Sequence, residues 1–318
     1  MMKTWNEYWF RPAPYFDLCF VRIIAVITQL KILTSMSEWY VGRAQLDNSY
    51  WNPIVVQLFL NLPAGWGLRP SLEFLDVVYY VACVAGVLSL VGLMTNLSLL
   101  VFTLSCTYLI SFIYSFGDFH HQEAVLVIAM GALALSPSGR VLSIDALLRR
   151  PRAAGFTRET SEFAGWPLKL IGWFFVLMYL SAFYSKIVHG GWDWPNGYTL
   201  QYYLIRDGMK HGSDLGLWLS QFHVLVLLLQ YFTILFQGTF ALAMLFPRTR
   251  WFFVPVGFCL HLGIQLTLSA GFYAWMAMYA VFVPWTAVFE RLLGFARGRT
   301  ETGTPSARAT TVAPLPRA

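Results

Sequence analysis

One stretch sets the organisation of this chain: Ala182-Phe-Tyr-Ser-Lys-Ile-Val-His-Gly-Gly-Trp-Asp-Trp-Pro-Asn-Gly-Tyr-Thr-Leu-Gln-Tyr-Tyr203. It begins inside a long apolar run, and Lys186 lies near the end of that run. A cation at such a position is costly unless it is paired, hydrated or neutral. The glycines and the proline that follow interrupt a helix, and the tryptophans and tyrosines suit a membrane–water interface. The stretch therefore predicts the end of a membrane span and an interfacial loop.

The composition of the whole chain agrees with a membrane protein. Of its 318 residues, 57% are hydrophobic and 12% are charged, and the mean hydropathy is +0.56. A soluble domain carries about twice that charged fraction. The net charge of +6 does not indicate a nucleic-acid partner, because most arginines lie in short loops between apolar runs, which is the positive-inside pattern of membrane proteins.

Apolar runs predict an all-α, polytopic transmembrane helical bundle of about eight spans. The predicted spans are residues 16–36, 72–93, 97–116, 124–135, 166–188, 217–246, 251–268 and 272–289. A further apolar piece at 54–62 is too short to cross and predicts an interfacial helix. Residues 1–15 form an N-terminal cytoplasmic segment, 16–290 the membrane domain, and 291–318 a tail whose composition predicts disorder.

The distribution of positive charge predicts the orientation of the bundle. With the short run 124–135 counted as a span, most cations fall on one side, in residues 1–15, 139–165, 247–250 and the tail. The other side receives Arg43, Arg69, Arg206 and Lys210. By the positive-inside rule both termini are cytoplasmic, and we expect a multi-pass protein of the cell membrane, typically the inner membrane of a bacterium. Lys186 and its aromatic loop then lie toward the outer face.

Lys186 has two interpretations. A lysine near a helix end extends its amine to the interface while its stem covers apolar surface. Alternatively, burial disfavours the ammonium form, so that a neutral amine becomes available as a general base. The residues alone leave both open.

Four histidine and glutamine side chains form further candidates. His261 lies in the middle of an apolar run, and Gln265 is one helical turn away on the same face. This pair either joins two helices by hydrogen bonds or contributes to a site. His120 and His121 are adjacent, and adjacent side chains point apart on a helix, so the pattern favours a hydrogen-bonding loop and no metal site. The four cysteines lie in apolar runs without metal-ligand spacing.

Motifs of several enzyme and transporter classes are absent from the sequence. It contains no P-loop, no HExxH and no GxSxG, which argues against ATP-driven transport and common hydrolase chemistry. It also lacks the two matching halves of many secondary transporters.

Four passages follow one another in a characteristic order. The first runs from Phe16-Asp17 through Arg22. The second joins His120–Glu123 to Leu135-Ser-Pro-Ser-Gly and Ser143-Ile-Asp145. The third runs from Tyr184-Ser-Lys186 into Trp192-Asp-Trp194 and Gly197-Tyr198. The fourth joins Pro247-Arg-Thr-Arg250 to His261-Leu-Gly-Ile264 and Gly271-Phe-Tyr273. In their order and spacing, over roughly residues 14–290, they resemble the membrane region of the vitamin K-dependent gamma-carboxylase-like family, the horizontally transferred transmembrane (HTTM) domain proteins.

The resemblance implies an enzyme that uses a reduced quinone such as vitamin K hydroquinone. In the carboxylase the matching lysine is understood as the base that deprotonates the hydroquinone. Lys186 would then be the base, and His261 with His120 or His121 would line the catalytic site. Such chemistry needs a dry cavity, because water would quench a strong base.

The carboxylase has a large extracytoplasmic domain after its membrane region, where this chain has about 28 residues. That difference argues against carboxylation of peptide glutamates. Three hypotheses remain: a membrane enzyme with a quinone or lipid-soluble substrate, an accessory protein for the maturation or immunity of a secreted peptide, and a lipid- or quinone-binding scaffold. The expected partners are the lipid bilayer and a hydrophobic small molecule or secreted peptide, with no nucleic acid.

Overall fold

The fold is a bundle of helices, as the sequence predicts. The computed structural model describes residues 2–61, 68–117, 123–149, 151 and 154–301, and it is 78% helical. Within this described part, the strands are β1 (Ala13–Pro14) and β2 (Thr160–Ser161), which pair antiparallel with Ala13 opposite Ser161. The predicted all-α transmembrane class is confirmed.

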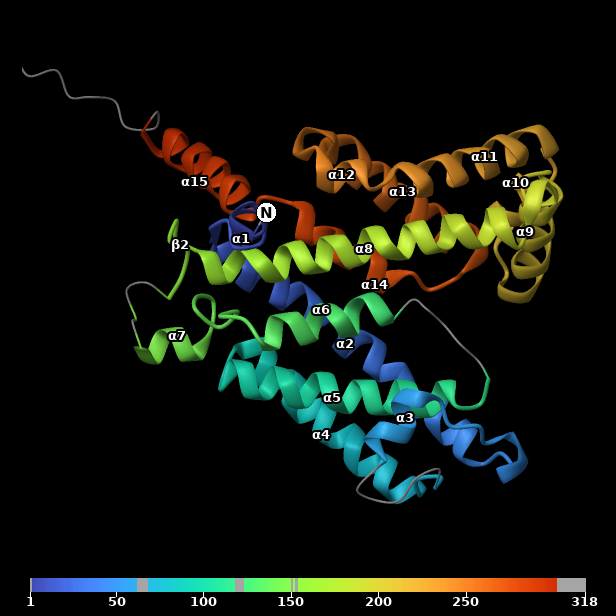
Figure 1. Cartoon of the computed structure of the whole chain (residues 1–318), viewed down its shortest axis with the longest axis horizontal. Helices are drawn as coiled ribbons and strands as arrows, with labels where there is room; N and C mark the ends of the chain where they lie inside the picture. The colour runs from blue at the N-terminus through green and yellow to red at the C-terminus, as the bar shows by residue number, and fades with distance from the viewer. Residues whose placement is uncertain (1, 62–67, 118–122, 150, 152–153, 302–318) are drawn as a thin grey trace, which may run out of the picture.

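Most of the longer helices run along the long dimension of the molecule, and α9 with α10 lies across one end (Figure 1). In chain order the bounds are α1 (Met2–Trp9), α2 (Tyr15–Ala44), α3 (Val55–Leu60), α4 (Leu72–Val91), α5 (Thr95–Tyr114), α6 (Ala124–Ala134), α7 (Ile144–Arg149), α8 (Glu162–Val188), α9 (Tyr198–His211), α10 (Asp214–Leu219), α11 (His223–Thr239), α12 (Leu242–Leu245), α13 (Arg250–Leu268), α14 (Tyr273–Met278) and α15 (Trp285–Glu301). Short 3-10 turns are η1 (Asn48–Tyr50), η3 (Gly191–Asp193), η4 (Pro247–Thr249) and η5 (Tyr279–Phe282).

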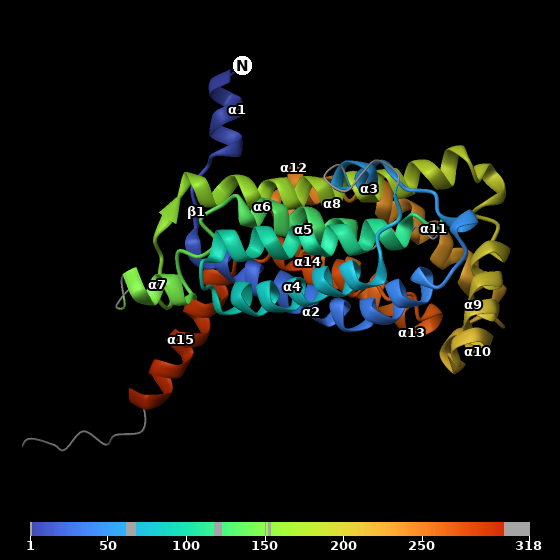
Figure 2. The ribbon, with the colours of Figure 1, turned by 90° about the horizontal axis from the view of Figure 1, so that it is seen from below.

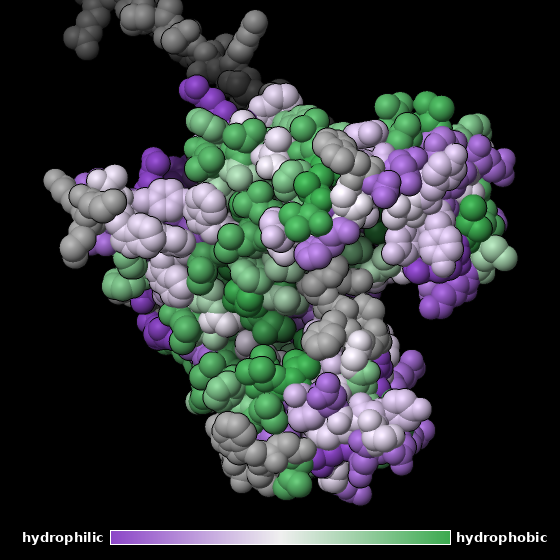
Figure 3. All heavy atoms as spheres, turned by 45° about the vertical axis from the view of Figure 1, so that its right-hand side comes forward, coloured by the Kyte–Doolittle hydropathy of each residue, from purple (hydrophilic) through white to green (hydrophobic). Residues whose placement is uncertain are grey.

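Several helices are long and apolar enough to cross a membrane. Five qualify: α4, α5, α8, the segment His223–Leu245 and the segment Pro247–Leu268. A sixth arises if Tyr273–Phe282 and Trp285–Gly294, which are bent by 75° at their break, count as one span. The predicted number of about eight is not confirmed. In a space-filling view, apolar surface covers the middle of the molecule and polar surface gathers on the lobes of one end (Figure 3).

The differences from the predicted spans have local causes. The run at 124–135 forms α6, whose 11 residues extend about 16 Å and so cover about half of a hydrocarbon core. The run expected at 272–289 breaks at Pro284, because proline has no N–H to continue the helical ladder. The span expected to begin at residue 217 begins at His223, after the separate short helix α10. In the predicted tail, α15 continues past Arg291 to Glu301, and residues 302–318 lie outside the described part.

The central helix is α2, which packs against α4, α5, α6, α8 and α14. Its polar residues Arg22 and Gln29 are fully buried, so they face protein rather than lipid, as the cost of exposing them to lipid requires. Lys31 is more exposed and places its Nζ 3.9 Å from the ring centre of Tyr273. At the other end of α2, Arg69 donates to the carbonyl oxygens of Ala44 at 2.6 Å and Leu46 at 2.7 Å, and so caps the helix.

The bounds of α8 follow from its sequence. Ser161 precedes the helix and its Oγ accepts a hydrogen bond from the backbone N–H of Phe163 at 3.2 Å, a typical N-terminal cap. The helix ends at Val188, just before the paired glycines. Gly191 has a φ of 56°, which a residue with a side chain rarely adopts. The structure therefore ends α8 just after Lys186, where the sequence predicts a break in the helix.

Candidate functional site

A chain of hydrogen bonds crosses the interior of the bundle between three helical segments. The hydroxyl of Tyr179, on α8, lies 2.8 Å from Nε2 of His261, on α13. The same hydroxyl is hydrogen-bonded to the hydroxyl of Tyr279, at the start of η5. The exposed fractions of Tyr179, His261 and Tyr279 are 1%, 4% and 2%. These three groups form a buried polar centre, which we call the tyrosine–histidine centre.

Aromatic rings surround the tyrosine–histidine centre. The His261 ring lies 5.0 Å from that of Phe272 and 5.1 Å from that of Trp275. The Tyr179 ring lies 4.5 Å from that of Phe240 and 5.1 Å from that of Trp275. Packing of this kind excludes water, and hydrogen bonds are stronger where the local dielectric constant is low. The centre therefore meets the requirement for a dry environment.

A glycine on α13 makes room for the centre. Gly257 lies one turn before His261, and a Cβ atom at that position would lie 2.0 Å from the hydroxyl oxygen of Tyr279. Such a contact is impossible without displacing the tyrosine. Since the Tyr279 ring packs 4.8 Å from that of Phe175, it has little freedom to move. The absence of a side chain at Gly257 is thus a condition for the observed hydrogen bonds.

Lys186 lies on the same helix as Tyr179, seven residues further on. Seven residues are close to two full turns, so the two side chains share a face and lie about 10 Å apart along the axis. Lys186 is partly buried. Its Nζ donates to the carbonyl of Ala182 at 3.2 Å and lies 5.2 Å from the centre of the Trp194 ring. Among the described residues, no carboxylate forms an ion pair with this lysine.

An apolar groove lies between α8 and α11 at the depth that separates Tyr179 from Lys186. It has a volume of about 660 Å³ and is lined by Phe183, Tyr231, Phe232, Ile234, Leu235, Gly238 and Thr239. Phe183 is one turn from Tyr179 and one turn from Lys186. Above the groove, Nε2 of Gln230 donates to the carbonyl of Trp194, which ties the aromatic loop to α11.

The structure sorts the predicted site residues. It brings Lys186 and His261 to the same group of helices, α8, α11, α13 and η5, with Tyr179 between them. His261, on α13, bonds to Tyr179, on α8, and so joins two helices by a hydrogen bond, whereas Oε1 of Gln265 accepts from the backbone N–H of Gly271 at 2.6 Å. His120 and His121 lie outside the described residues. Tyr179 and Tyr279 were not predicted.

A second polar centre occupies the end of the bundle that holds α1 and α15. There Arg22, with 0% of its surface exposed, donates from Nη1 to the carbonyl of Ser138 at 3.0 Å and from Nη2 to the carbonyl of Leu142 at 2.6 Å. We call this group the arginine junction. It fixes the loop after α6 against α2. Gly92, with a φ of 70°, leaves space beside it, because a Cβ there would lie 2.3 Å from Cβ of Ser143.

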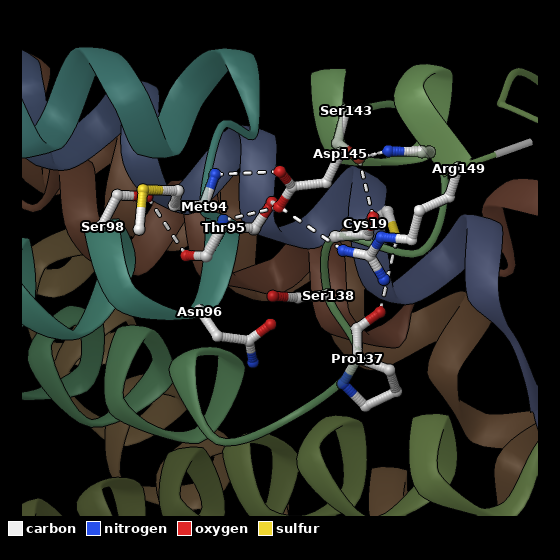
Figure 4. Close-up of polar contacts among 12 residues, drawn as sticks. Cys19, Met94, Thr95, Asn96, Ser98, Pro137, Ser138, Ser143, Asp145 and Arg149 are labelled. Atoms are coloured by element: carbon white, nitrogen blue, oxygen red, sulfur yellow. Dashed lines mark hydrogen bonds and ion pairs between the residues drawn. The ribbon is translucent and has the colours of Figure 1, made fainter. Parts of the chain in front are cut away.

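Asp145 extends the arginine junction to the start of α5 (Figure 4). Its Oδ1 accepts from the N–H of Met94 at 2.9 Å, and its Oδ2 accepts from the N–H and hydroxyl of Thr95 at 2.7 and 2.8 Å. Burial raises the pKa of the Asp145 carboxyl, but these donors and nearby Arg149 outweigh it and hold the pKa below its ordinary value of 3.8. The carboxylate thereby satisfies free N–H groups at the helix start.

The arginine junction unites passages that are far apart in the sequence. Arg22, the Ser-Pro-Ser-Gly loop and the Ser143-Ile-Asp145 passage meet in it. Nearby, Oδ1 of Asp17 accepts hydrogen bonds from the N–H and hydroxyl of Thr286, both at 2.6 Å. These contacts hold loops and helix ends together. The arginine junction is therefore structural, and the tyrosine–histidine centre with Lys186 is the candidate for chemistry.

The depressed pKa of Asp145 predicts a pH-dependent contribution to stability. The contribution is complete above the ordinary value of 3.8 and is lost as the pH falls through the lower pKa of the folded state. We expect Asp145→Asn to lower stability by about 1–2 kcal/mol at neutral pH, the scale of a helix cap, and by less below pH 3.8. Thermal unfolding in detergent across pH measures both. Asp207→Asn is the control, because Asp207 pairs with its neighbour Arg206. If the loss of stability caused by Asp145→Asn is as large in acid as at neutral pH, the lowered pKa of Asp145 is contradicted.

Two glycines on α13 provide a matched test of the tyrosine–histidine centre. Gly257→Ala should destabilise the protein by about 1–3 kcal/mol, the usual cost of overpacking, because the new methyl group displaces Tyr279. Gly263→Ala makes the same change where no atom lies within 4 Å, so it should be neutral or stabilise by up to about 1 kcal/mol through helix propensity. Thermal unfolding of both variants is the measurement. Equal changes in the stability of the two variants would contradict the close packing of Tyr279 against Gly257.

Comparison with known proteins places the chain in a family. No curated protein matches it, and no solved structure matches it. The model of the HTTM domain family matches residues 10–286, which include every helix from α2 to η5 and all of the passages that predicted the resemblance. Since the match covers most of the chain, this protein belongs to the HTTM domain family.

Proposed function

We propose that this protein is a membrane enzyme that acts on a quinone or another lipid-soluble substrate, with Lys186 as the base. The observation that carries the proposal is the position of Lys186. It is partly buried and has no carboxylate partner among the described residues. It lies one helical turn from Phe183, which lines an apolar groove, and two turns from Tyr179 of the tyrosine–histidine centre.

The surroundings of Lys186 favour its neutral form. Its ammonium group has one helix carbonyl and one indole ring as partners, which is little compensation for lost hydration. A neutral amine has a lone pair at Nζ and can accept a proton from an acidic hydroxyl. A low dielectric constant around it makes such a transfer efficient, since no water needs to reorganise.

The groove supports a substrate with an apolar tail. Its lining of phenylalanine, tyrosine and leucine side chains suits an isoprenoid or acyl chain. The residues of this chain therefore fit a quinone: Phe183, Tyr231 and Leu235 would hold the tail, and Lys186 would face the head group. A reduced quinone supplies an acidic hydroxyl and two electrons when bound. His261, fixed by Tyr179, would hold or release a proton at Nε2 at the deeper end of the site.

A second candidate function rests on the groove alone. An apolar groove binds a lipid or quinone without any reaction, so a binding scaffold, including an accessory protein for a secreted peptide, needs the groove and not the base. The two functions differ in what they require of Lys186. A fixed charge or an interfacial anchor serves the second, whereas a neutral amine is essential to the first.

We expect Lys186→Arg and Lys186→Ala to fold and to lose turnover. Arginine keeps the charge and a long stem but stays protonated, so it cannot act as a base. The substrate is first sought by mass spectrometry of small molecules that copurify in mild detergent. The aerobic oxidation of a reduced menaquinone analogue, followed by absorbance, then serves as the assay, and each variant should lose at least about 100-fold in rate.

Lys210→Arg is the control for this experiment, because it makes the same change on an exposed helix at the same end of the molecule. If Lys186→Arg turns over substrate as the wild-type protein does while Lys186→Ala does not, Lys186 acts as an anchor or fixed charge. The binding function would then be the better account of the protein. Binding of the analogue without turnover by the wild-type protein would also favour the scaffold.

The proposal includes an orientation, with both termini in the cytoplasm and Lys186 toward the outer face. It is supported by the positions of α1 and α15 at one end of the bundle and of α9 and α10 at the other (Figures 1 and 2). Single cysteines at Arg149 and Asn196, both exposed, test it in a variant without the four native cysteines. We expect a membrane-impermeant thiol reagent to label Asn196→Cys and not Arg149→Cys in intact cells. Labelling of Arg149→Cys and not of Asn196→Cys would mean that the protein has the opposite orientation.

A further inference from the structure

The N-terminal helix α1 is firmly attached to the end of the bundle that holds the chain termini. Nζ of Lys169, on α8, donates to the carbonyl of Tyr8 and to that of Trp9 at 3.3 Å. Nε1 of Trp173 donates to the hydroxyl of Tyr8 at 2.5 Å. The backbone after α1 passes directly over Gly165, where a Cβ would lie 2.1 Å from the carbonyl oxygen of Arg11. The position of α1 is thus determined by α8.

The direction and side chains of α1 place it at the membrane surface. It stands across the long axis of the bundle, roughly perpendicular to the spans (Figure 2), so it runs along the plane of a membrane that the spans cross. Trp5 is 63% exposed on α1, and Trp251 is 78% exposed at the start of α13. Exposed tryptophans of this kind mark the depth of the lipid head groups, and a short amphipathic helix in the plane of the surface is typical of that layer.

Three cations gather around Tyr8 at this depth. Lys169 contacts Tyr8 directly, with its Nζ 5.3 Å from the ring centre. Arg11 is near enough to Lys169 for their like charges to repel, and Arg250 lies within electrostatic range of the Tyr8 hydroxyl. We call Arg11, Lys169 and Arg250 the basic cluster. The three come from the segment after α1, from α8 and from α13, which are separated in sequence and meet only in the fold.

The basic cluster differs from two other arginines at the same end, because no carboxylate pairs with it among the described residues. Arg158 lies 2.5 Å from Glu290, and Arg140 lies 4.0 Å from Glu159. In the cluster, Nε of Arg250 donates to the carbonyl of Ala243 at 2.9 Å, and Lys169 binds carbonyls. Carbonyl partners leave the positive charge uncompensated. Lys169 and Arg11, whose like charges repel, therefore lack a counter-charge within the described residues, as does Arg250.

We propose that the basic cluster binds the phosphate of an anionic phospholipid of the surrounding membrane. A lipid phosphate supplies the missing negative charge at the depth where α1 and the exposed tryptophans lie, and basic pockets beside membrane helices bind such head groups. Lys169 retains a third donor hydrogen for it, and the two guanidinium groups match phosphate oxygens. The lipid chains would then lie along the apolar surface of α8 and α13. This site is independent of the proposed function at Lys186.

Binding of phosphatidylglycerol by the full-length protein in detergent tests the proposal. Native mass spectrometry, with titration of the lipid, gives the affinity. We expect phosphatidylglycerol to bind and phosphatidylcholine to bind at least about ten-fold more weakly, because the latter carries no net charge. Arg11→Gln should lower the affinity for phosphatidylglycerol about five-fold. The double variant Arg11→Gln with Arg250→Gln should lower it about 25-fold, which corresponds to about 1 kcal/mol of binding free energy for each cation.

Arg158→Gln is the matched control, since it removes the same charge at the same end from an existing ion pair and should leave the affinity unchanged. Arg11→Gln decides the outcome if Arg250→Gln folds poorly, because the Arg11 side chain makes no hydrogen bond within the described residues. Equal binding of the two lipids, an unchanged affinity of Arg11→Gln, or displacement of the lipid by an equimolar amount of inorganic phosphate would each overturn the proposal.

Discussion

The bilayer core provides no water to hydrogen-bond a buried polar group, so every such group in this bundle needs a partner within the protein. Arg22 on the central helix α2 is the strictest case, because a guanidinium is costly to bury. It is paired with the carbonyls of the loop after α6. That loop leads into α7, whose Asp145 holds the start of α5. Asp17, which like Arg22 lies on α2, accepts hydrogen bonds from Thr286 at the start of α15. The end of the bundle that carries the termini is thus organised by the polar residues of one helix.

The same constraint acts in the middle of the bundle with a different result. The hydroxyl of Tyr179 is hydrogen-bonded both to His261 and to Tyr279. Phenol and imidazole groups can each donate and accept, so a change of protonation at one member alters the hydrogen bonds of the next. The arginine junction, in contrast, pairs a group that is always charged with carbonyls. One centre is suited to stability and the other to proton chemistry.

Much of the fold could be predicted from the sequence, because burial of apolar runs is a local signal. The helical class, the end of α8 and the inward position of Arg22 and Gln29 follow from hydropathy and from the cost of polar groups in lipid. The number of spans was harder, since α6 is short and Pro284 breaks the last apolar run. Partners could not be predicted where they depend on packing. Tyr279 can bond to Tyr179 because Gly257 leaves room for its hydroxyl, and no pattern in one sequence specifies that contact. The position of Tyr179, two turns before Lys186 on one face, was the available signal.

Two lysines near opposite ends of α8 show why residue type does not decide a role in a membrane. Lys169 and Lys186 are 17 residues apart, or about 25 Å along the helix, close to the thickness of a hydrocarbon core, and each is partly buried. Lys169 binds the last carbonyls of α1, which have no partner within their own helix. Lys186 binds the carbonyl of Ala182, which already accepts the backbone N–H of the same lysine in the α-helical ladder.

The difference between these partners sets the charge that each lysine can keep. The free carbonyl end of α1 carries the negative pole of a helix dipole and stabilises the ammonium of Lys169. A shared carbonyl and an indole ring do less for Lys186, while an apolar groove begins one turn away at Phe183. Lys169 therefore keeps its charge at the interface, where its Nζ joins α8 to the end of α1. Lys186 has the weaker support for its charge and the nearer apolar surface, and these are the conditions under which a lysine amine becomes a base.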